Sequence, residues 1–283
     1  MYYKIGLSTP CGHITEENLA SFCAAGLSVM EISDGMAGYA CFDYDNARTL
    51  AEKYDIKLHS MHLPFMPFTQ IDISSPLLAD NTVEYYRELI EKGASIGIKI
   101  FVLHPSGEPI KDEERSLRME TAKKTLARLA EIASTNDAVI AVENLPRTCL
   151  GKNSAEIAEL LSAHEALRAC FDTNHLLSEP LADFMRNINN RIITTHISDY
   201  DFVNERHWLP GEGKINWQEI LSILTEIGYQ GPWMYELSLV CPKTILRDRS
   251  LCHADLMLNA EELFSGKTPT VISQPKPNLG WWE

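Results

Sequence analysis

The sequence contains no run of about 18 consecutive apolar residues, which is the length that a membrane-spanning helix needs. Its start, "MYYKIGLSTPCGHITEENL", lacks the basic stretch followed by an apolar run that identifies a secretory signal. The seven cysteines are odd in number and form no CxxC pair, so neither a disulfide framework nor a thiolate metal site is expected. These absences predict a cytoplasmic protein with reduced thiols and no membrane partner.

Basic residues are also scarce. The chain has 25 lysines and arginines against 39 aspartates and glutamates, which leaves a formal net charge of −14. Such a charge repels phosphate backbones and argues against a nucleic-acid partner. The remaining composition, 45% hydrophobic and 23% charged, is that of an ordinary globular chain of 283 residues.

A glycine-rich phosphate-binding turn is missing after the first predicted strand, where the sequence reads "LSTPCGH". The chain has instead a regular alternation of β-rich and amphipathic helical stretches. Helical spacing is clear over residues 82–97, 119–133 and 216–228, the last with Asn216 as N-cap and Gly228 as its end. The β-rich stretches cover residues 2–8, 28–33, 57–63, 99–105, 138–145, 168–174, 191–198 and 232–238. This order predicts an α/β fold of the (β/α)8 TIM barrel type, with a doubly wound open sheet as the alternative.

One barrel domain is expected over residues 1–264. The tail, residues 265–283, differs in composition and is predicted to pack on the barrel or on a neighbouring subunit of a homo-oligomer. Trp281 and Trp282 would anchor it.

Polar side chains stand at the ends of six predicted strands. In a barrel the carboxyl ends of all strands meet at one mouth, so these side chains converge although they are far apart in the sequence. Buried carboxylates need a compensating cation, and mixed oxygen and nitrogen ligands suit Mn²⁺, Mg²⁺, Co²⁺ or Zn²⁺. We therefore predict one divalent metal ion, preferably Mn²⁺, bound by Glu143, Asp172, His196 and Glu236. His62 and His104 end the third and fourth strands and are expected to contact the substrate at the same mouth.

Each of these residues has a simpler interpretation when it is taken alone. Asp172 could cap the helix that follows it, and His62 and His104 could be hydrogen-bonded structural residues. Asp199 and Asp201 are interpreted as solvated loop charges or caps. The repetition of acid or histidine at four successive strand ends favours the metal site.

Five segments resemble the xylose isomerase-like barrel superfamily, which includes a sugar isomerase/epimerase branch and endonuclease IV. They are "VENLP", "FDTNH", "THISD", "LPGEGKINW" and "MYEL", in this order, and the resemblance covers roughly residues 1–262. It implies that the metal tetrad falls on the same four residues and that Glu143 and Glu236 also act as the acid/base pair. It further implies that His175, within "FDTNH", binds a substrate oxygen.

Two positions depart from the ketose 3-epimerases of this superfamily. Those enzymes carry a further glutamate after the first metal glutamate, where "ENLPRTC" offers Arg147 and Cys149. They also place a substrate-binding arginine at the position of His207.

The stretch "ERHWLPGEG" resembles instead a loop of endonuclease IV that supplies ligands to a third metal ion. By this resemblance Glu205 and His207 are candidates for additional metal ligands. Together with His62, His104 and His175 they would complete a trinuclear site. Arg206, His207 and Trp208 are expected to contact the substrate, and Phe65 to add an apolar wall, whereas Trp233 is expected in the core.

The leading functional hypothesis is a metal-dependent aldose–ketose isomerase or ketose epimerase that acts on a sugar or sugar phosphate. The metal would stabilise an enediolate while one glutamate removes a proton and the other returns it. A dehydratase acting on a cyclic polyol such as an inosose could use the same site. The remaining hypotheses are a zinc phosphodiesterase of the endonuclease IV type, which the net charge disfavours, and a non-catalytic barrel that binds a sugar or a protein.

Overall fold

The predicted barrel is present in the computed structural model, which describes residues 3–270, 273–277 and 279–280. Its strands form one parallel sheet in the order β7-β6-β5-β4-β3-β2-β1-β8. Ile197 bridges to Tyr235, and the backbone N–H of Ile197 donates to Met234, so the ends of β7 and β8 close the barrel. The strands are β1 (Ile5–Thr9), β2 (Val29–Ser33), β3 (Lys57–His62), β4 (Ile100–Leu103), β5 (Val139–Glu143), β6 (Arg168–Asp172), β7 (Ile192–His196) and β8 (Trp233–Tyr235). This consecutive order excludes the doubly wound alternative.

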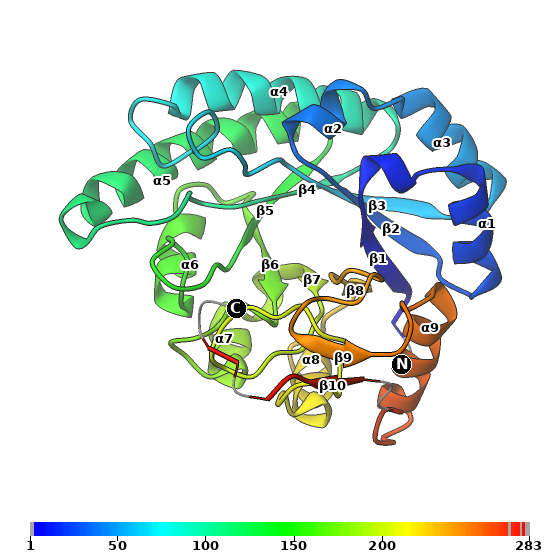
Figure 1. Cartoon of the computed structure of the whole chain (residues 1–283). Coiled ribbons are helices and arrows are strands. Elements are labelled where there is room, and N and C mark those ends of the chain that lie inside the picture. The colour runs from blue at the N-terminus through cyan, green and yellow to red at the C-terminus, as the bar shows by residue number, and fades with distance from the viewer. Residues whose placement is uncertain (1–2, 271–272, 278, 281–283) are drawn as a thin grey trace.

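The helices surround the sheet (Figure 1). They are α1 (Glu16–Ala24), α2 (Met36–Ala40), α3 (Tyr44–Lys53), α4 (Ala79–Ser95), α5 (Asp112–Thr135), α6 (Ser154–Leu161), α7 (Leu181–Ile188), α8 (Trp217–Glu226) and α9 (His253–Phe264). The predicted N-cap of α8 is confirmed, because the Asn216 side chain accepts from the backbone N–H of Glu219 at 3.4 Å. None of the helices in the described part of the chain is long and apolar enough to cross a bilayer.

Helix α5 begins earlier than the predicted residue 119. Its first turn contains Asp112, Glu113 and Glu114, which show no apolar periodicity but carry the negative charge that a helix N-terminus favours. Periodicity alone therefore placed this helix start too late.

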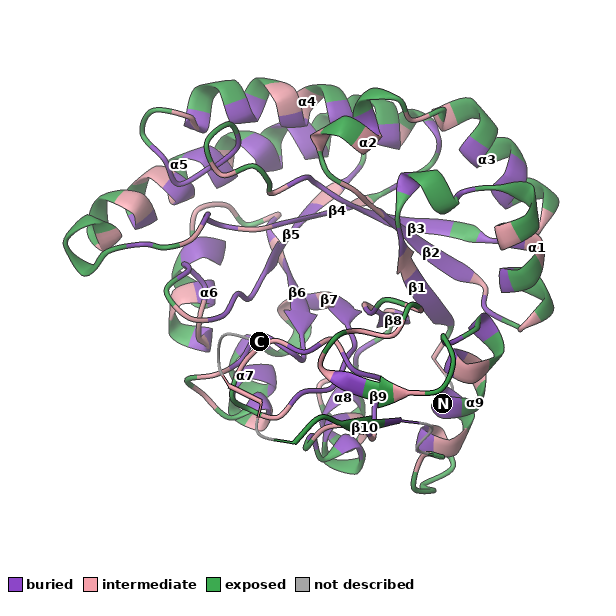
Figure 2. Cartoon of the chain, viewed as in Figure 1, coloured by how far each residue is buried: buried purple, intermediate pink, exposed green. Residues whose placement is uncertain are grey.

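The core lies between the sheet and the inward faces of the helices, where the buried residues are concentrated (Figure 2). Strands of a parallel barrel are covered on both faces and are therefore apolar along most of their length. Trp233 is 1% exposed, and its ring lies 5.6 Å from that of Trp217 and 5.3 Å from that of Phe264, which confirms its core position.

A small two-stranded sheet lies outside the barrel. Strand β9 (Ile245–Arg247) pairs antiparallel with β10 (Ser273–Pro275). Arg247 forms a buried ion pair of 3.2 Å with Glu212 in the loop after β7. The packing expected for the whole tail, residues 265–283, remains a prediction, and Trp281 and Trp282 lie outside the described residues.

Candidate metal centre

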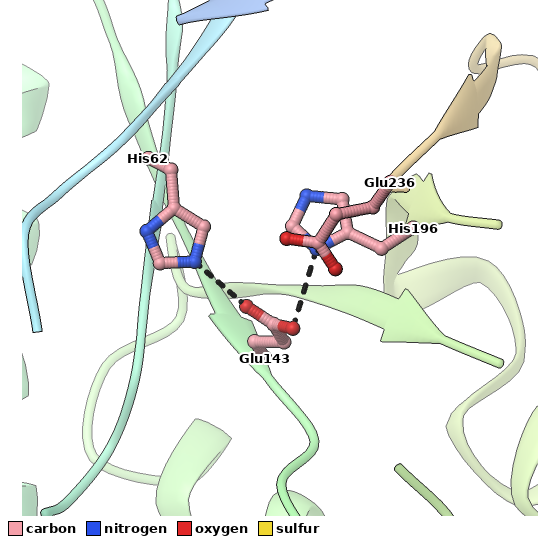
Figure 3. Close-up of side chains that lie close together, drawn as sticks. All are labelled: His62, Glu143, His196 and Glu236. Atoms are coloured by element: carbon pink, nitrogen blue, oxygen red, sulfur yellow. Dashed lines mark hydrogen bonds and ion pairs between the residues drawn. The ribbon is translucent and has the colours of Figure 1, made fainter. Parts of the chain in front are cut away.

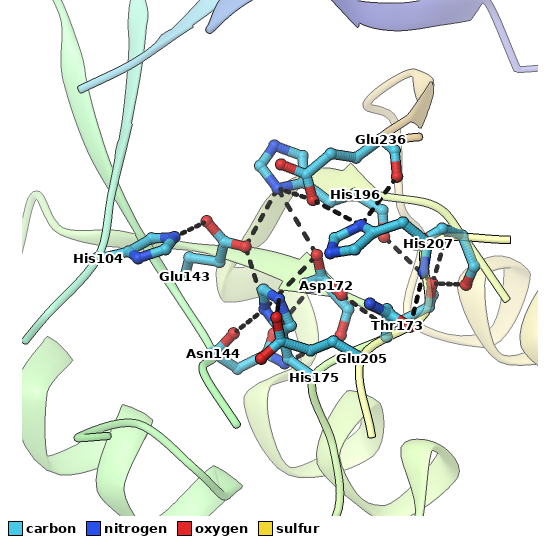
Figure 4. A network of polar contacts seen from close by, with 12 residues as sticks. His104, Glu143, Asn144, Asp172, Thr173, His175, His196, Glu205, His207 and Glu236 are labelled. Carbon is cyan, nitrogen blue, oxygen red and sulfur yellow. Dashed lines mark hydrogen bonds and ion pairs between the residues drawn. The ribbon is translucent and has the colours of Figure 1, made fainter. Parts of the chain in front are cut away.

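The carboxyl ends of β5, β6, β7 and β8 bring the four predicted metal ligands together (Figures 3 and 4). Nδ1 of His196 lies 3.2 Å from Oε1 of Glu143, 3.5 Å from Oε2 of Glu236 and 3.9 Å from Oδ2 of Asp172. Three of the four residues are fully buried, and Glu236 has a side chain that is 22% exposed. The tetrad is therefore a buried cluster around Nδ1 of His196, and Glu236 is its one partly exposed member.

Two oxygens of this tetrad fit a cation better than they fit the protein alone. Oδ2 of Asp172 and Oε2 of Glu236 are buried and have no hydrogen-bond partner among the residues that the structure describes. Leaving such groups buried without compensation costs several kcal/mol, on the order of 2–7 for a neutral polar group and more for a charge. Both oxygens face Nδ1 of His196, so the donor set suits a divalent metal ion.

The pKa values of the three carboxylates in the tetrad also favour a bound cation. Burial raises the pKa of Glu236 to about 7; His196 opposes this rise, and the negative Glu143 and Asp172 add to it. Burial also raises the pKa of Asp172. Burial opposes ionisation of Glu143 too, but His196 and His104 hold its pKa well below the usual range. The protein thus compensates the buried negative charge of Glu143 well, and that of Asp172 and Glu236 poorly.

His62 and His104 face the same mouth, as the sequence predicts. Nε2 of His62 lies 3.0 Å from Oε2 of Glu143, and Nε2 of His104 lies 3.4 Å from the same oxygen. Nδ1 of His62 donates to the carbonyl oxygen of Leu63 at 2.8 Å. Phe65 stacks on His104 at 4.1 Å, which places the expected apolar wall beside the site.

His175, Glu205 and His207 form a second group next to the tetrad (Figure 4). Each offers one ligand atom within 4.8 Å of the other two. Nδ1 of His175 donates to the carbonyl of Asn144 at 3.0 Å, and Nδ1 of His207 donates to the carbonyl of Glu236 at 3.2 Å. A backbone carbonyl that fixes the proton of one ring nitrogen leaves the other nitrogen free to bind a ligand.

Arg206 and Trp208, which the sequence predicts to contact the substrate, are buried and bonded within the protein. The Arg206 side chain is buried, pairs with Asp201 at 2.9 Å and donates to the carbonyl of Gly280 at 2.8 Å. Trp208 is 1% exposed, and its indole N–H donates to the hydroxyl of Thr244 at 2.9 Å. Both side chains therefore hold the loop after β7 in place. Asp201, interpreted as a solvated loop charge or a cap, also accepts from the backbone N–H groups of Val203 and Asn204, which is the second of these roles.

Asp199 is fully buried and accepts from backbone N–H groups, so of its two interpretations, a solvated charge or a cap, the first is wrong and the second fits. Its carboxylate accepts from the backbone N–H of Gly211 at 2.8 Å and of Ile215 at 3.1 Å, and from the indole of Trp217 at 2.9 Å. A Cβ atom at Gly213 would lie 2.2 Å from the Asp199 carboxylate, so this position admits only glycine. The "LPGEG" turn is thus folded around one buried carboxylate.

Replacing Asp199 with alanine is expected to lower the free energy of unfolding by at least about 3 kcal/mol, because several buried N–H donors lose their acceptor and each costs roughly 1–3 kcal/mol. Chemical denaturation measures this change. Asp45→Ala is the control, since its side chain is 84% exposed and pairs with the exposed Arg48, and it should change stability by less than about 1 kcal/mol. Equal effects of the two substitutions would contradict the structural role of Asp199.

Sequence reasoning missed Glu31, which lies on β2 and is fully buried. One of its carboxylate oxygens lies 2.9 Å from Nε2 of His196. The available signal was a lone acidic residue within the otherwise apolar stretch "VMEIS".

A cavity of about 330 Å³ opens beside Glu236 and His207. Hydroxyl side chains from three segments line it, and no lysine or arginine does so within the described ranges. These hydroxyl-bearing residues are Ser8, Thr9, Ser33 and Ser238.

Comparison with known proteins extends these observations. A profile of the family described as xylose isomerase-like TIM barrel matches residues 23–245. The uncharacterized protein MJ1311 of Methanocaldococcus jannaschii is 28% identical over 191 residues, and the match spans 64% of this chain and 64% of that protein, just under two thirds of its length. A solved D-tagatose 3-epimerase-like protein has a TM-score of 0.75 at 22% identity, over 93% of this chain and 96% of that one. An L-ribulose 3-epimerase has a TM-score of 0.75 at 19% identity, over 94% of each chain.

Proposed function

Because this chain belongs to the xylose isomerase-like TIM barrel family, we propose that it is a sugar isomerase or epimerase that uses a divalent cation. The observation that carries this proposal is the convergence of Glu143, Asp172, His196 and Glu236, with two buried carboxylate oxygens left without a protein partner. Sugar 3-epimerases among the solved structures with the same fold support it.

The two glutamates would divide the proton transfer between them. A bound cation would supply the Lewis acidity that makes a C–H bond next to a sugar carbonyl acidic. Both oxygens of Glu143 face imidazoles and its side chain is buried, whereas the side chain of Glu236 is partly exposed and lines the cavity. Glu236 is therefore the better placed base to remove the proton, and Glu143 would return it on the other face or on the neighbouring carbon. His62, His104 and His175 would hold the substrate oxygens.

The substrate we propose is a sugar or polyol without phosphate. The cavity beside Glu236 offers hydroxyl groups and imidazoles but no cationic side chain among the described residues. Two arginines of the neighbouring loops are already paired, Arg147 with Glu108 at 2.7 Å and Glu205 at 2.5 Å, and Arg206 with Asp201. Among the described lining residues, a phosphate group would therefore find no lysine or arginine to bind it.

A metal-dependent phosphodiesterase is the second candidate. The group of His175, Glu205 and His207 favours it, because both histidines have the backbone-fixed proton that metal-ligating histidines commonly show. In this reading the mouth would hold up to three metal ions, with His62 and His104 as further ligands beside Glu143. The net charge of −14 disfavours a nucleic-acid substrate.

Metal analysis together with an exchange assay tests the proposal. We expect one divalent ion per chain and incorporation of solvent deuterium next to the carbonyl of an unphosphorylated ketose, in a screen of ketoses, aldoses and inososes. Three ions per chain with hydrolysis of a phosphodiester would favour the second candidate. A protein that binds no metal would contradict both.

A further inference from the structure

Glu31 is a carboxylate buried in the middle of the barrel. It lies on β2, and His196 lies on β7, which is not a neighbour of β2 in the sheet. Oε1 of Glu31 accepts from the Ser8 hydroxyl at 2.9 Å and lies 2.9 Å from Nε2 of His196. Oε2 accepts from the Ser60 hydroxyl at 2.7 Å. Three donors from three strands therefore hold this one side chain.

The strand register explains this arrangement. Ser8 on β1 is the direct partner of Glu31, and Glu31 is the direct partner of Ser60 on β3. Residues in register on neighbouring strands share a face of the sheet, so the two serines stand on either side of the carboxylate. An irregularity in the β2–β3 pairing lies directly before Glu31, and such irregularities re-aim side chains.

The contact with Glu31 determines how the imidazole of His196 is turned. An ionised carboxylate only accepts hydrogen bonds, so Nε2 of His196 must carry the proton that it donates. Nδ1 then faces the carboxylates of Glu143, Asp172 and Glu236 at 3.2, 3.9 and 3.5 Å. A carboxylate bonded to the distal nitrogen in this way orients a metal-ligating histidine and makes it a better ligand.

We propose that Glu31 is a positioning residue that fixes the tautomer and the ring orientation of His196 and thereby sets the affinity of the tetrad for its metal ion. This inference rests on the metal site of the proposed function. Glu31 does not line the cavity, so it acts through His196 and not on the substrate.

A purely structural role makes a different prediction. If Glu31 served only to pack the barrel, its replacement would lower stability and leave metal affinity unchanged. If it serves the metal site, the same replacement weakens metal binding as well, because His196 loses the carboxylate that orients it. Metal affinity therefore separates the two roles.

Glu31→Gln tests the proposal, because glutamine keeps the size of the side chain and an oxygen that can accept from His196. We expect the dissociation constant for Mn²⁺, measured by competition with a chelator, to rise about 10–100-fold. The melting temperature of the metal-free variant should fall, because the amide N–H₂ cannot accept from Ser8, Ser60 or His196 as the carboxylate oxygen does. Glu212→Gln is the matched control, since Glu212 is also buried but pairs with Arg247 away from the tetrad; it should melt lower and bind Mn²⁺ as tightly as the parent.

An unchanged dissociation constant in Glu31→Gln would overturn the inference while leaving the metal site intact. A parent protein that binds no Mn²⁺ would overturn the metal site itself, and this inference with it. If Glu31→Gln does not fold, the double variant Ser8→Ala/Ser60→Ala decides, because it frees the carboxylate without removing it. Weaker Mn²⁺ binding is expected there, and unchanged binding would contradict the proposal.

Discussion

Glu236→Gln is expected to lower turnover of the sugar substrate by about 10²–10⁴-fold, the range that a positioned general acid or base contributes. The amide has nearly the same shape but cannot accept a proton. Glu236 is the residue of the tetrad with a partly exposed side chain, 22%, and it lines the cavity beside the site. Activity measured at saturating Mn²⁺ gives the size of the effect.

Loss of metal would produce the same loss of turnover, so activity alone does not identify the base. The deciding measurement is exchange of the substrate proton with deuterated water in variants shown to be loaded with metal. Glu236→Gln should abolish exchange if Glu236 removes the proton. Glu143→Gln is the comparison, and it should retain exchange from one face while forming no product. A metal-loaded Glu236→Gln protein that turns over the sugar at the parent rate would disprove this mechanism.

The barrel and the convergence of the four side chains at its mouth were predictable because both follow from local patterns. Apolar strands alternate with amphipathic helices, and Glu143, Asp172 and His196 are the last residues of β5, β6 and β7. The geometry of a parallel barrel then brings strand ends together whatever their distance along the chain.

The roles of the loop after β7 were not predictable in this way. Asp199 and Arg206 have the composition of a solvated loop, but their partners lie farther along the chain: Gly211 and Trp217 for Asp199, and Gly280 for Arg206. Whether a charged loop residue is solvated or buried depends on such contacts, and residue spacing does not reveal them.

Glu31 escaped prediction for a related reason. Its function depends on strand register, which places Ser8 and Ser60 beside it, and on the closure of the barrel, which brings His196 to it. The sequence of a single strand determines neither its register with the neighbouring strands nor its contacts across the barrel.

Asp172→Asn is expected to change stability in opposite directions with and without metal. The backbone N–H of Asn174 already donates to one oxygen of Asp172 at 2.5 Å, and asparagine can keep that bond. The other oxygen is buried without a partner among the described residues, and an amide N–H₂ there could donate to the neighbouring carboxylates.

Metal-free Asp172→Asn should therefore gain about 1–3 kcal/mol, which corresponds to several degrees of melting temperature at roughly 2–4 °C per kcal/mol. The same change removes a direct ligand, so Mn²⁺ affinity should fall by more than the about 10–100-fold that loss of an outer-shell partner causes. The control is Asp72→Asn, because Asp72 is buried in an ion pair with Arg118 at 2.9 Å and should melt lower whether metal is present or not. Melting curves in chelator and in excess Mn²⁺ separate the two cases. If metal-free Asp172→Asn also melted lower than the parent, Asp172 would be stabilised by the protein alone, and its unpaired oxygen would no longer argue for a cation.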